Sequence, residues 1–276
     1  MLPPVIAEKV FQIGPLPITN SFLNGLLATV LFVILGLSLR RLTVAAPRGW
    51  QNGVEALLEF MLDFIDQVTH DRARSRRFLP IVGTLFLFIL VSNWLGLLPG
   101  IGTIYINEYV RGELERVPLL RAATSDLNMT LALGIMAVAV SHVLGIFTVG
   151  LGHHVGKFVP IAGVWRSLRA FGRVPLGTAA INLFTAIVEV GVGLIELVSE
   201  AAKMVSLSLR LFGNVFAGEV LLAVMASLLA FFLPLPFMAM ELVVGLVQAM
   251  VFSMLTLVYL TLATERPHHE ATAGAH

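Results

Sequence analysis

Residues 176–232 read LGTAAINLFTAIVEVGVGLIELVSEAAKMVSLSLRLFGNVFAGEVLLAVMASLLAFF, a largely apolar run of nearly sixty residues. As one helix this run would be about 85 Å long, whereas the hydrocarbon core of a bilayer is about 30 Å thick. The run must therefore tilt strongly, lie partly in the membrane plane, or break. Gly191, Gly193, Gly213 and Gly218 are candidate bends.

The composition of the whole chain indicates a membrane protein. The 276 residues are 57% hydrophobic and only 13% charged, against about 25% charged residues in an ordinary soluble domain. A chain of this size with so little charge cannot cover a globular surface with solvated groups. It has no cysteine, which excludes disulfides, iron–sulfur clusters and thiolate zinc sites.

The apolar runs predict an all-α polytopic membrane protein with about five crossings, an interfacial amphipathic helix and a long, strongly tilted C-terminal helical hairpin. We expect residues 1–276 to form a single membrane domain. Its predicted helices are a spanning helix at 21–41, an amphipathic helix at 50–70, spanning helices at 78–98 and 129–151, a long tilted helix or helices at 176–232, and a last helix at 237–263. Residues 105–126 are expected to form a loop, and LPLP at 233–236 a turn.

The arginine and lysine residues predict the orientation. The loops after the first and third crossings are basic, whereas the loop between the second and third mixes both signs. The basic loops should be cytoplasmic, with the N-terminus outside and the C-terminus inside. The first residues, MLPPVIAEKVFQIGPLPITN, do not resemble a cleavable signal peptide.

Polar residues of the long run gather on one face of a helical wheel drawn at 100° per residue. The members of this polar stripe are Asn182, Glu189, Glu196, Glu200, Lys203, Ser206, Arg210 and Asn214. Glu219 falls diametrically opposite Arg210. Some residues of the stripe could simply pair with one another: Glu200 could form an ion pair with Lys203, three residues on, or Glu196 could pair loosely with that lysine.

Arg210 is harder to explain as a structural residue. A guanidinium does not lose its proton, and an arginine at the membrane centre costs about 2.5–3.5 kcal/mol on insertion scales. Its partner must therefore lie outside its own helix, or be water. In the last helix Glu241 and Gln248 share a face with Thr256 and Tyr259. Carboxyl groups at membrane depth, such as Glu219 and Glu241, are suited to a proton relay.

Several segments together resemble subunit a of the F-type ATP synthases, the membrane stator that faces the rotating c-ring. They are SLSLRLFGNVFAGEV (206–220), ELVVGLVQAMVFSMLTLVYLTLATE (241–265), NWLGLLPG (93–100) and SDLNMTLALG (125–134). The resemblance implies two aqueous half-channels that carry protons to and from the c-ring carboxylates. It implies as partners the c-ring, the peripheral-stalk subunit b, other synthase subunits and lipid, but no nucleic acid. It implies no cofactor, no metal and no catalytic chemistry in this chain.

The resemblance also implies roles for individual residues. Arg210 matches the stator arginine that keeps the passing c-subunit carboxylate ionised and separates the half-channels. Residues assigned around it are Asn214 and Gln248; to the outer half-channel Glu219, Glu241 (where some members have histidine), Asp126 and Asn128; and to the inner half-channel Glu196, Ser199, Lys203 and Ser206. A bacterial plasma membrane is the expected location.

Two alternatives and one geometric question remain open. A secondary transporter could use Arg210 to bind an anionic substrate, but the sequence lacks the internal repeat of such folds. A membrane-embedded enzyme is disfavoured, because HHEATAGAH at 268–276 does not match the HExxH zinc motif. A plain antiparallel register about a turn near 234 would pair Gln248 with a residue near 221 and not with Arg210.

Overall fold

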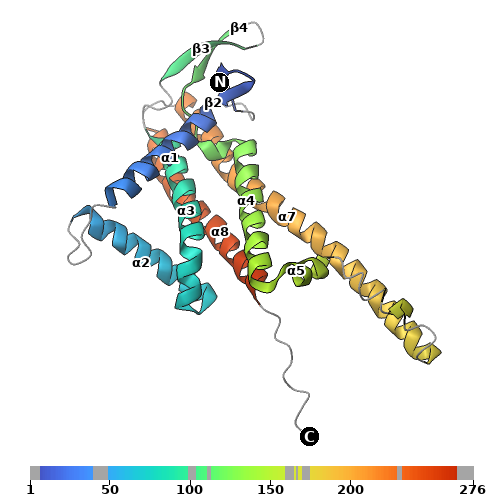
Figure 1. Ribbon diagram of the computed structural model, residues 1–276. Coiled ribbons are helices and arrows are strands. Elements are labelled where there is room, and N and C mark those ends of the chain that lie inside the picture. Colours follow the sequence, from blue (N-terminus) through green and yellow to red (C-terminus); the bar gives the residue numbers. More distant parts are fainter. Residues whose placement is uncertain are drawn as a thin grey trace. The chain divides into compact units, whose positions relative to one another are not determined.

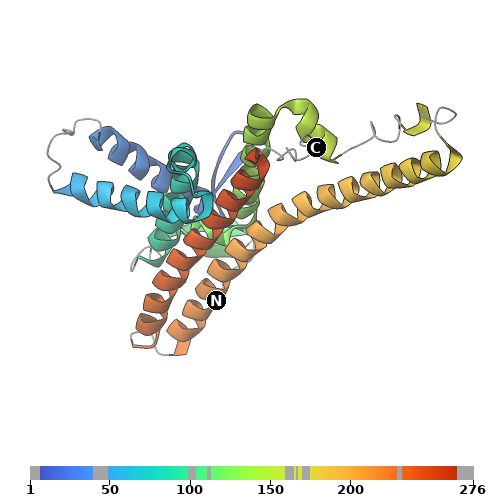
Figure 2. The ribbon, with the colours of Figure 1, turned by 90° about the horizontal axis from the view of Figure 1, so that it is seen from below.

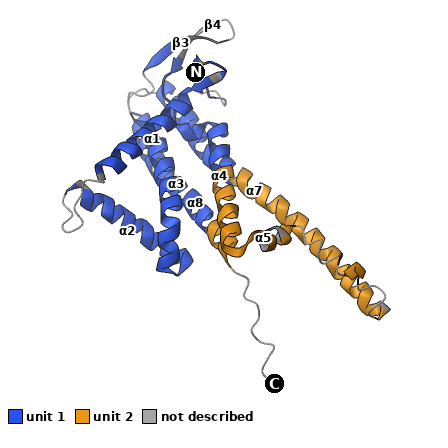
Figure 3. Cartoon of the chain, in the orientation of Figure 1, with its two compact units in different colours: residues 1–134, 207–257 blue, residues 135–206, 258–276 orange. Residues whose placement is uncertain are grey.

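The computed structural model describes residues 7–39, 49–98, 104–110, 113–158, 165, 167–169, 175–228 and 232–265 (Figure 1). The chain divides into two compact units, coloured separately in Figure 3. Unit 1 comprises Met1–Gly134 and Leu207–Leu257, and unit 2 comprises Ile135–Ser206 and Val258–His276. The HHEATAGAH segment lies outside the described residues.

Five helices are long and apolar enough to cross a membrane. They are α1 (Asn20–Leu39), α3 (Arg72–Leu97), α4 (Leu127–Val149), α7 (Leu176–Leu228) and α8 (Pro234–Thr264). Two further helices, α2 (Trp50–Thr69) and α5 (Leu151–Phe158), are less apolar. The predicted all-α polytopic fold with a long C-terminal helical region is therefore confirmed.

The long apolar run forms one helix without a break. Helix α7 contains 53 residues, which corresponds to about 80 Å. The glycines expected to permit bends do not end the helix, because glycine in a helix interior costs only about 1 kcal/mol relative to alanine. Continuous α-helix is the arrangement that satisfies every backbone group within the segment itself.

The segment expected to be a loop contains regular structure, so that expectation was wrong. Strands β3 (Tyr105–Val110) and β4 (Glu113–Pro118) form an antiparallel hairpin, and a short 3₁₀ helix, η2 (Ala123–Ser125), follows. The sequence YINEYV contains two tyrosines, an isoleucine and a valine, residue types that favour strands. A second hairpin, formed by β1 (Lys9–Ile13) and β2 (Leu16–Thr19), precedes α1.

Unit 1 is held together by close approach of backbones and by side-chain hydrogen bonds from α3 to α8. A Cβ on Gly96 of α3 would lie 2.6 Å from Ala122 Cβ, so only glycine allows this contact. Asn93 Nδ2 donates to the Gly245 carbonyl at 3.5 Å, and Trp94 Nε1 donates to the Leu242 carbonyl at 3.2 Å. The NWLG part of the motif NWLGLLPG thus joins α3 to α8 and to the segment before η2.

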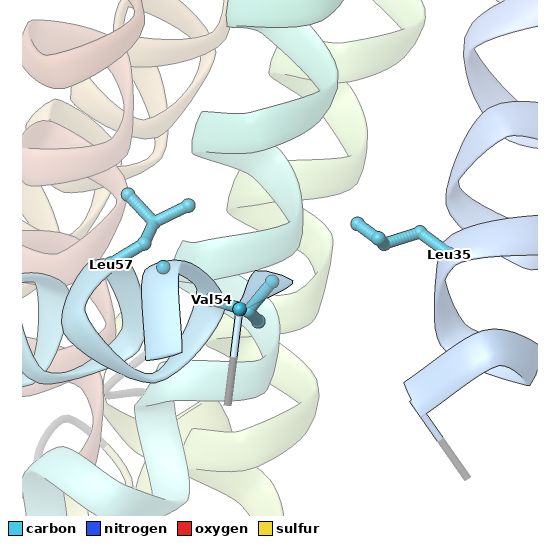
Figure 4. Close-up of a pocket in the computed structure, with 5 residues that line it drawn as sticks. Leu35, Val54 and Leu57 are labelled. Carbon is cyan, nitrogen blue, oxygen red and sulfur yellow. The ribbon is translucent and has the colours of Figure 1, made fainter. Parts of the chain in front are cut away.

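Helix α2 and helix α1 border an open apolar recess. Its lining residues are Leu35, Gly49, Gly53, Val54 and Leu57, and Figure 4 shows Leu35 across from Val54 and Leu57. Farther along the same face of α2, Met61 and Ile65 are buried in the core, whereas Glu55, Glu59 and Asp63 lie on the other face. This helix is therefore amphipathic, as its acidic residues predicted.

Within unit 1 the end of α7 runs beside α8 in an antiparallel hairpin (Figure 2). Asn214 contacts Gln248 and Gly218 lies against Glu241, so the register is centred near residue 231. The predicted pairing of Gln248 with a residue near 221 was wrong. The turn had been placed at 233–236, whereas α8 already begins at Pro234, because proline is well suited to the first helical position.

Candidate ion-translocation site

The end of α7 has one buried face, and Arg210 is not on it. Leu207, Ser208 and Leu211 are at most 2% exposed. Arg210 is exposed and, among the residues that the structure describes, it forms no hydrogen bond or ion pair. A permanent cation thus projects from an apolar helix with its head group uncovered by the described part of this chain.

Asn214 and Gln248 form a polar contact one helical turn beyond Arg210. The side-chain Nδ2 of Asn214 donates to Gln248 Oε1 at 2.6 Å. Gln248 is 4% exposed, and its own Nε2 has no hydrogen-bond partner among the described residues. Gln248 therefore meets α7 at Asn214, and its free donor is available to a further group.

Glu219 faces inward and forms a partly buried ion pair with Arg121. Two nitrogens of the guanidinium, Nε and Nη2, lie 2.9 and 2.8 Å from Glu219 Oε2. Arg121 is 6% exposed, and its guanidinium carbon lies 5.9 Å from the centre of the Phe216 ring. Because Glu219 lies opposite Arg210 on the helix, Arg121 contacts the side of α7 that faces away from Arg210.

Arg121 was not among the predicted site residues. In the sequence it is one charge in a loop that contains both signs. The signal that could have identified it is the run of small residues that follows, AATS at 122–125, all of which are buried. Small residues permit close backbone approach between membrane helices, and Arg121 immediately precedes them.

Glu241 is a second carboxylate in this cluster and has a different environment. It is 7% exposed, and its carboxylate occupies the space where Gly218 lacks a side chain. It forms no hydrogen bond or ion pair with any described residue, and it interacts electrostatically with Glu219. Within the described part of the chain, the cluster therefore contains two carboxylates and one cation.

Asp126 and Asn128, predicted at the outer channel mouth, lie at the start of α4. Asp126 Oδ1 accepts a hydrogen bond from the Asn128 backbone N–H at 3.0 Å, and the Asp126 carbonyl accepts one from the Thr130 N–H at 3.1 Å. Asp126 is therefore a helix N-cap, which accounts for its burial. The side chain of Asn128 is exposed, and a role of either residue in transport stays a prediction.

The predicted inner-channel residues belong to unit 2. Lys203 Nζ donates to Glu200 Oε1 at 2.6 Å, which confirms the expected bridge between these residues. Two partners were missed: His142 Nε2 lies 3.5 Å from Glu200 Oε2, and Lys203 Nζ lies 5.2 Å from the centre of the Tyr259 ring. Glu196 is half-buried, while Ser199 and Ser206 are exposed.

These features define a class: a polytopic membrane protein whose spanning helices carry partly paired charges. A family model described as ATP synthase A chain matches residues 22–261, and the chain belongs to this family. ATP synthase subunit a of Desulfotalea psychrophila is 33% identical over 244 residues, covering 88% of this chain and 83% of that protein.

Two further relatives carry the same description over nearly the whole chain. ATP synthase subunit a of Mycobacterium tuberculosis is 32% identical over 258 residues, covering 91% of this chain and 90% of that protein. That of Moorella thermoacetica is 29% identical over 253 residues, covering 91% and 94%. The resemblance inferred from the sequence motifs is confirmed, and the chain is an integral membrane component of an ATP synthase.

Proposed function

We propose that this chain forms two aqueous half-channels beside a ring of c subunits and that Arg210 faces the carboxylates of that ring. The observation that carries the proposal is the exposed guanidinium of Arg210, which lacks a partner among the described residues. An unpaired arginine inside hydrocarbon is costly. A carboxylate on another subunit supplies the missing partner and, because that subunit moves, can also leave.

The mobility of the partner explains why Arg210 differs from Arg121. Arg121 is buried and paired within this chain, as expected for a fixed structural charge. Arg210 must bind each arriving carboxylate in turn, so a permanent partner would compete with the ring. Proton flow through such a device delivers about 2.3 kcal/mol per charge per 100 mV to the rotor, and this chain performs no catalytic chemistry of its own.

The remaining residues divide between the two half-channels. We assign Asn214 and Gln248 to the surroundings of Arg210. To the outer half-channel we assign Glu219, Glu241, Asp126 and Asn128, and to the inner one Glu196, Ser199, Lys203 and Ser206. The loop charges support an orientation with the N-terminus outside and the C-terminus in the cytoplasm. We propose further that the chain contacts the peripheral-stalk subunit b and resides in a bacterial plasma membrane, since the relatives described above are bacterial.

The test is an Arg210→Ala variant in the whole complex, reconstituted in vesicles. We expect it to abolish ATP-driven proton pumping and to open a passive proton leak that requires the c-ring. Arg74→Ala is the matched control, because Arg74 is an exposed arginine of α3 with a single surface ion pair, and it should pump like the parent. Coupled pumping by Arg210→Ala would refute the proposal and would favour a transporter that binds an anion.

A further inference from the structure

We infer that Arg121 is the fixed counter-ion of Glu219, so that Glu219 stays ionised and Glu241 is the carboxylate of this cluster that exchanges protons. The inference rests on the proposed function, since it names which group of the outer half-channel carries the proton. It makes Arg121 a positioning residue, one that acts through Glu219 and does not itself meet the proton.

The geometry of the ion pair supports a permanent charge on Glu219. Both Nε and Nη2 of Arg121 approach the same carboxylate oxygen, at 2.9 and 2.8 Å. Hydrogen bonds between ionised groups are roughly twice as strong as neutral ones, and a guanidinium does not lose its proton. With Arg121 only 6% exposed, a proton on Glu219 would leave a buried cation without its partner.

Arg121 is also held so that it cannot turn away. Its backbone carbonyl accepts a hydrogen bond from Asn24 Nδ2 at 2.8 Å, which ties it to α1. The next residue, Ala122, packs directly against Gly96 of α3. Its guanidinium lies over the Phe216 ring, on the same helix as Glu219. Three separate elements therefore fix both ends of this side chain.

Glu241 has none of these restraints. Its carboxylate lies over Gly218 and forms no hydrogen bond or ion pair with any described residue. The ionisable groups that the structure relates to it are Glu219, by direct electrostatic interaction, and Arg121 through that residue. Two ionised carboxylates would repel each other, and Arg121 neutralises only one of them. When Glu241 takes up a proton from the outer water, this repulsion disappears. Glu241 then passes the proton to the c-ring carboxylate.

The test compares charge removal with charge-pair removal in the whole complex, reconstituted in vesicles. Arg121→Gln and Glu219→Gln each leave one buried charge unpaired, and we expect each to lower ATP-driven proton pumping at least about tenfold. The double variant Arg121→Gln/Glu219→Gln removes both charges while keeping two hydrogen-bonding amides, and pumping should return to within about threefold of the parent. Arg121→Lys keeps the charge and should retain pumping, whereas Glu241→Gln should abolish it in every background.

An infrared measurement on the same vesicles separates a positioning role from a purely structural one. We expect the parent to show an ionised-carboxylate band that disappears in Glu219→Gln and a pH-dependent carboxylic-acid band that disappears in Glu241→Gln. The inference is overturned if the acid band disappears in Glu219→Gln instead. It is equally overturned if the assembled double variant pumps no better than Glu219→Gln, or if Arg121→Lys is as defective as Arg121→Gln. The Arg210→Ala experiment tests the proposed function separately, because it does not involve this cluster.

Discussion

Replacing Gly218 with alanine should move the carboxylate of Glu241 without unfolding the chain. A Cβ at position 218 would meet Glu241 Cδ, Oε1 and Oε2 well inside van der Waals distance. Because ordinary contacts between carbon atoms lie at about 3.5–4.0 Å, the carboxylate must shift by roughly 1 Å or more. These atoms end a flexible side chain, so the strain is only about 0.5–1.5 kcal/mol. Alanine offsets it with about 1 kcal/mol of helix propensity.

The effect of Gly218→Ala on transport should be much larger than its effect on stability. A misplacement of about 1 Å at a reacting group can lower a rate by about 100-fold. We therefore expect ATP-driven proton pumping in vesicles to fall about 10- to 100-fold, with an almost unchanged melting temperature. Gly36→Ala is the control, since a Cβ there would meet nothing within 4 Å. Parent-like pumping by Gly218→Ala, or an equal defect in both variants, would refute this reasoning.

Two further substitutions separate packing from transport. A Cβ at Gly96 would lie 2.6 Å from Ala122 Cβ and 2.9 Å from its Cα. Because backbone cannot shift as a side chain does, Gly96→Ala should lower the stability of the fold by about 1–3 kcal/mol. Its melting temperature should fall, and a melting temperature equal to that of Gly36→Ala would contradict the packing argument. Gln248→Leu removes the bond to Asn214, yet interhelical hydrogen bonds in membranes average only about 0.6 kcal/mol. Its melting temperature should thus barely change while coupled pumping falls, and a drop as large as that of Gly96→Ala would show that Gln248 is mainly structural.

The sequence predicted the features that depend on a single helix. Hydropathy located the five long apolar helices because each must satisfy its backbone internally and cover the same thickness of hydrocarbon. The angular spacing of α-helix separated Arg210 from Glu219, and the structure indeed leaves the first exposed and turns the second inward. The bridge between Glu200 and Lys203 was predictable for the same reason, since residues three apart share a face.

Features that depend on two helices could not be predicted in the same way. The register of α8 against α7 depends on where the connection lies, and a proline can either end a turn or begin a helix. The structure uses Pro234 in the second way, which moves every contact of Gln248. Arg121 was missed because its partner, Glu219, is 98 residues away in sequence, and the one local sign of its burial is the run of small residues that follows it.

The pairing of Arg121, which contacts α7, bears on the role of Arg210, which projects from it. In the proposed mechanism, an ionised carboxylate near Arg210 would compete with the c-ring for this arginine, since opposite charges attract strongly where water is scarce. Glu219 does not compete in this way for two reasons: it lies on the opposite side of the helix, and Arg121 already neutralises its charge. In the proposed mechanism, the ion pair of Arg121 therefore protects the working arginine as well as positioning Glu219. A chain that kept Glu219 but lost Arg121 would place an unneutralised carboxylate on the same helix as Arg210, and the cost would appear in proton transport.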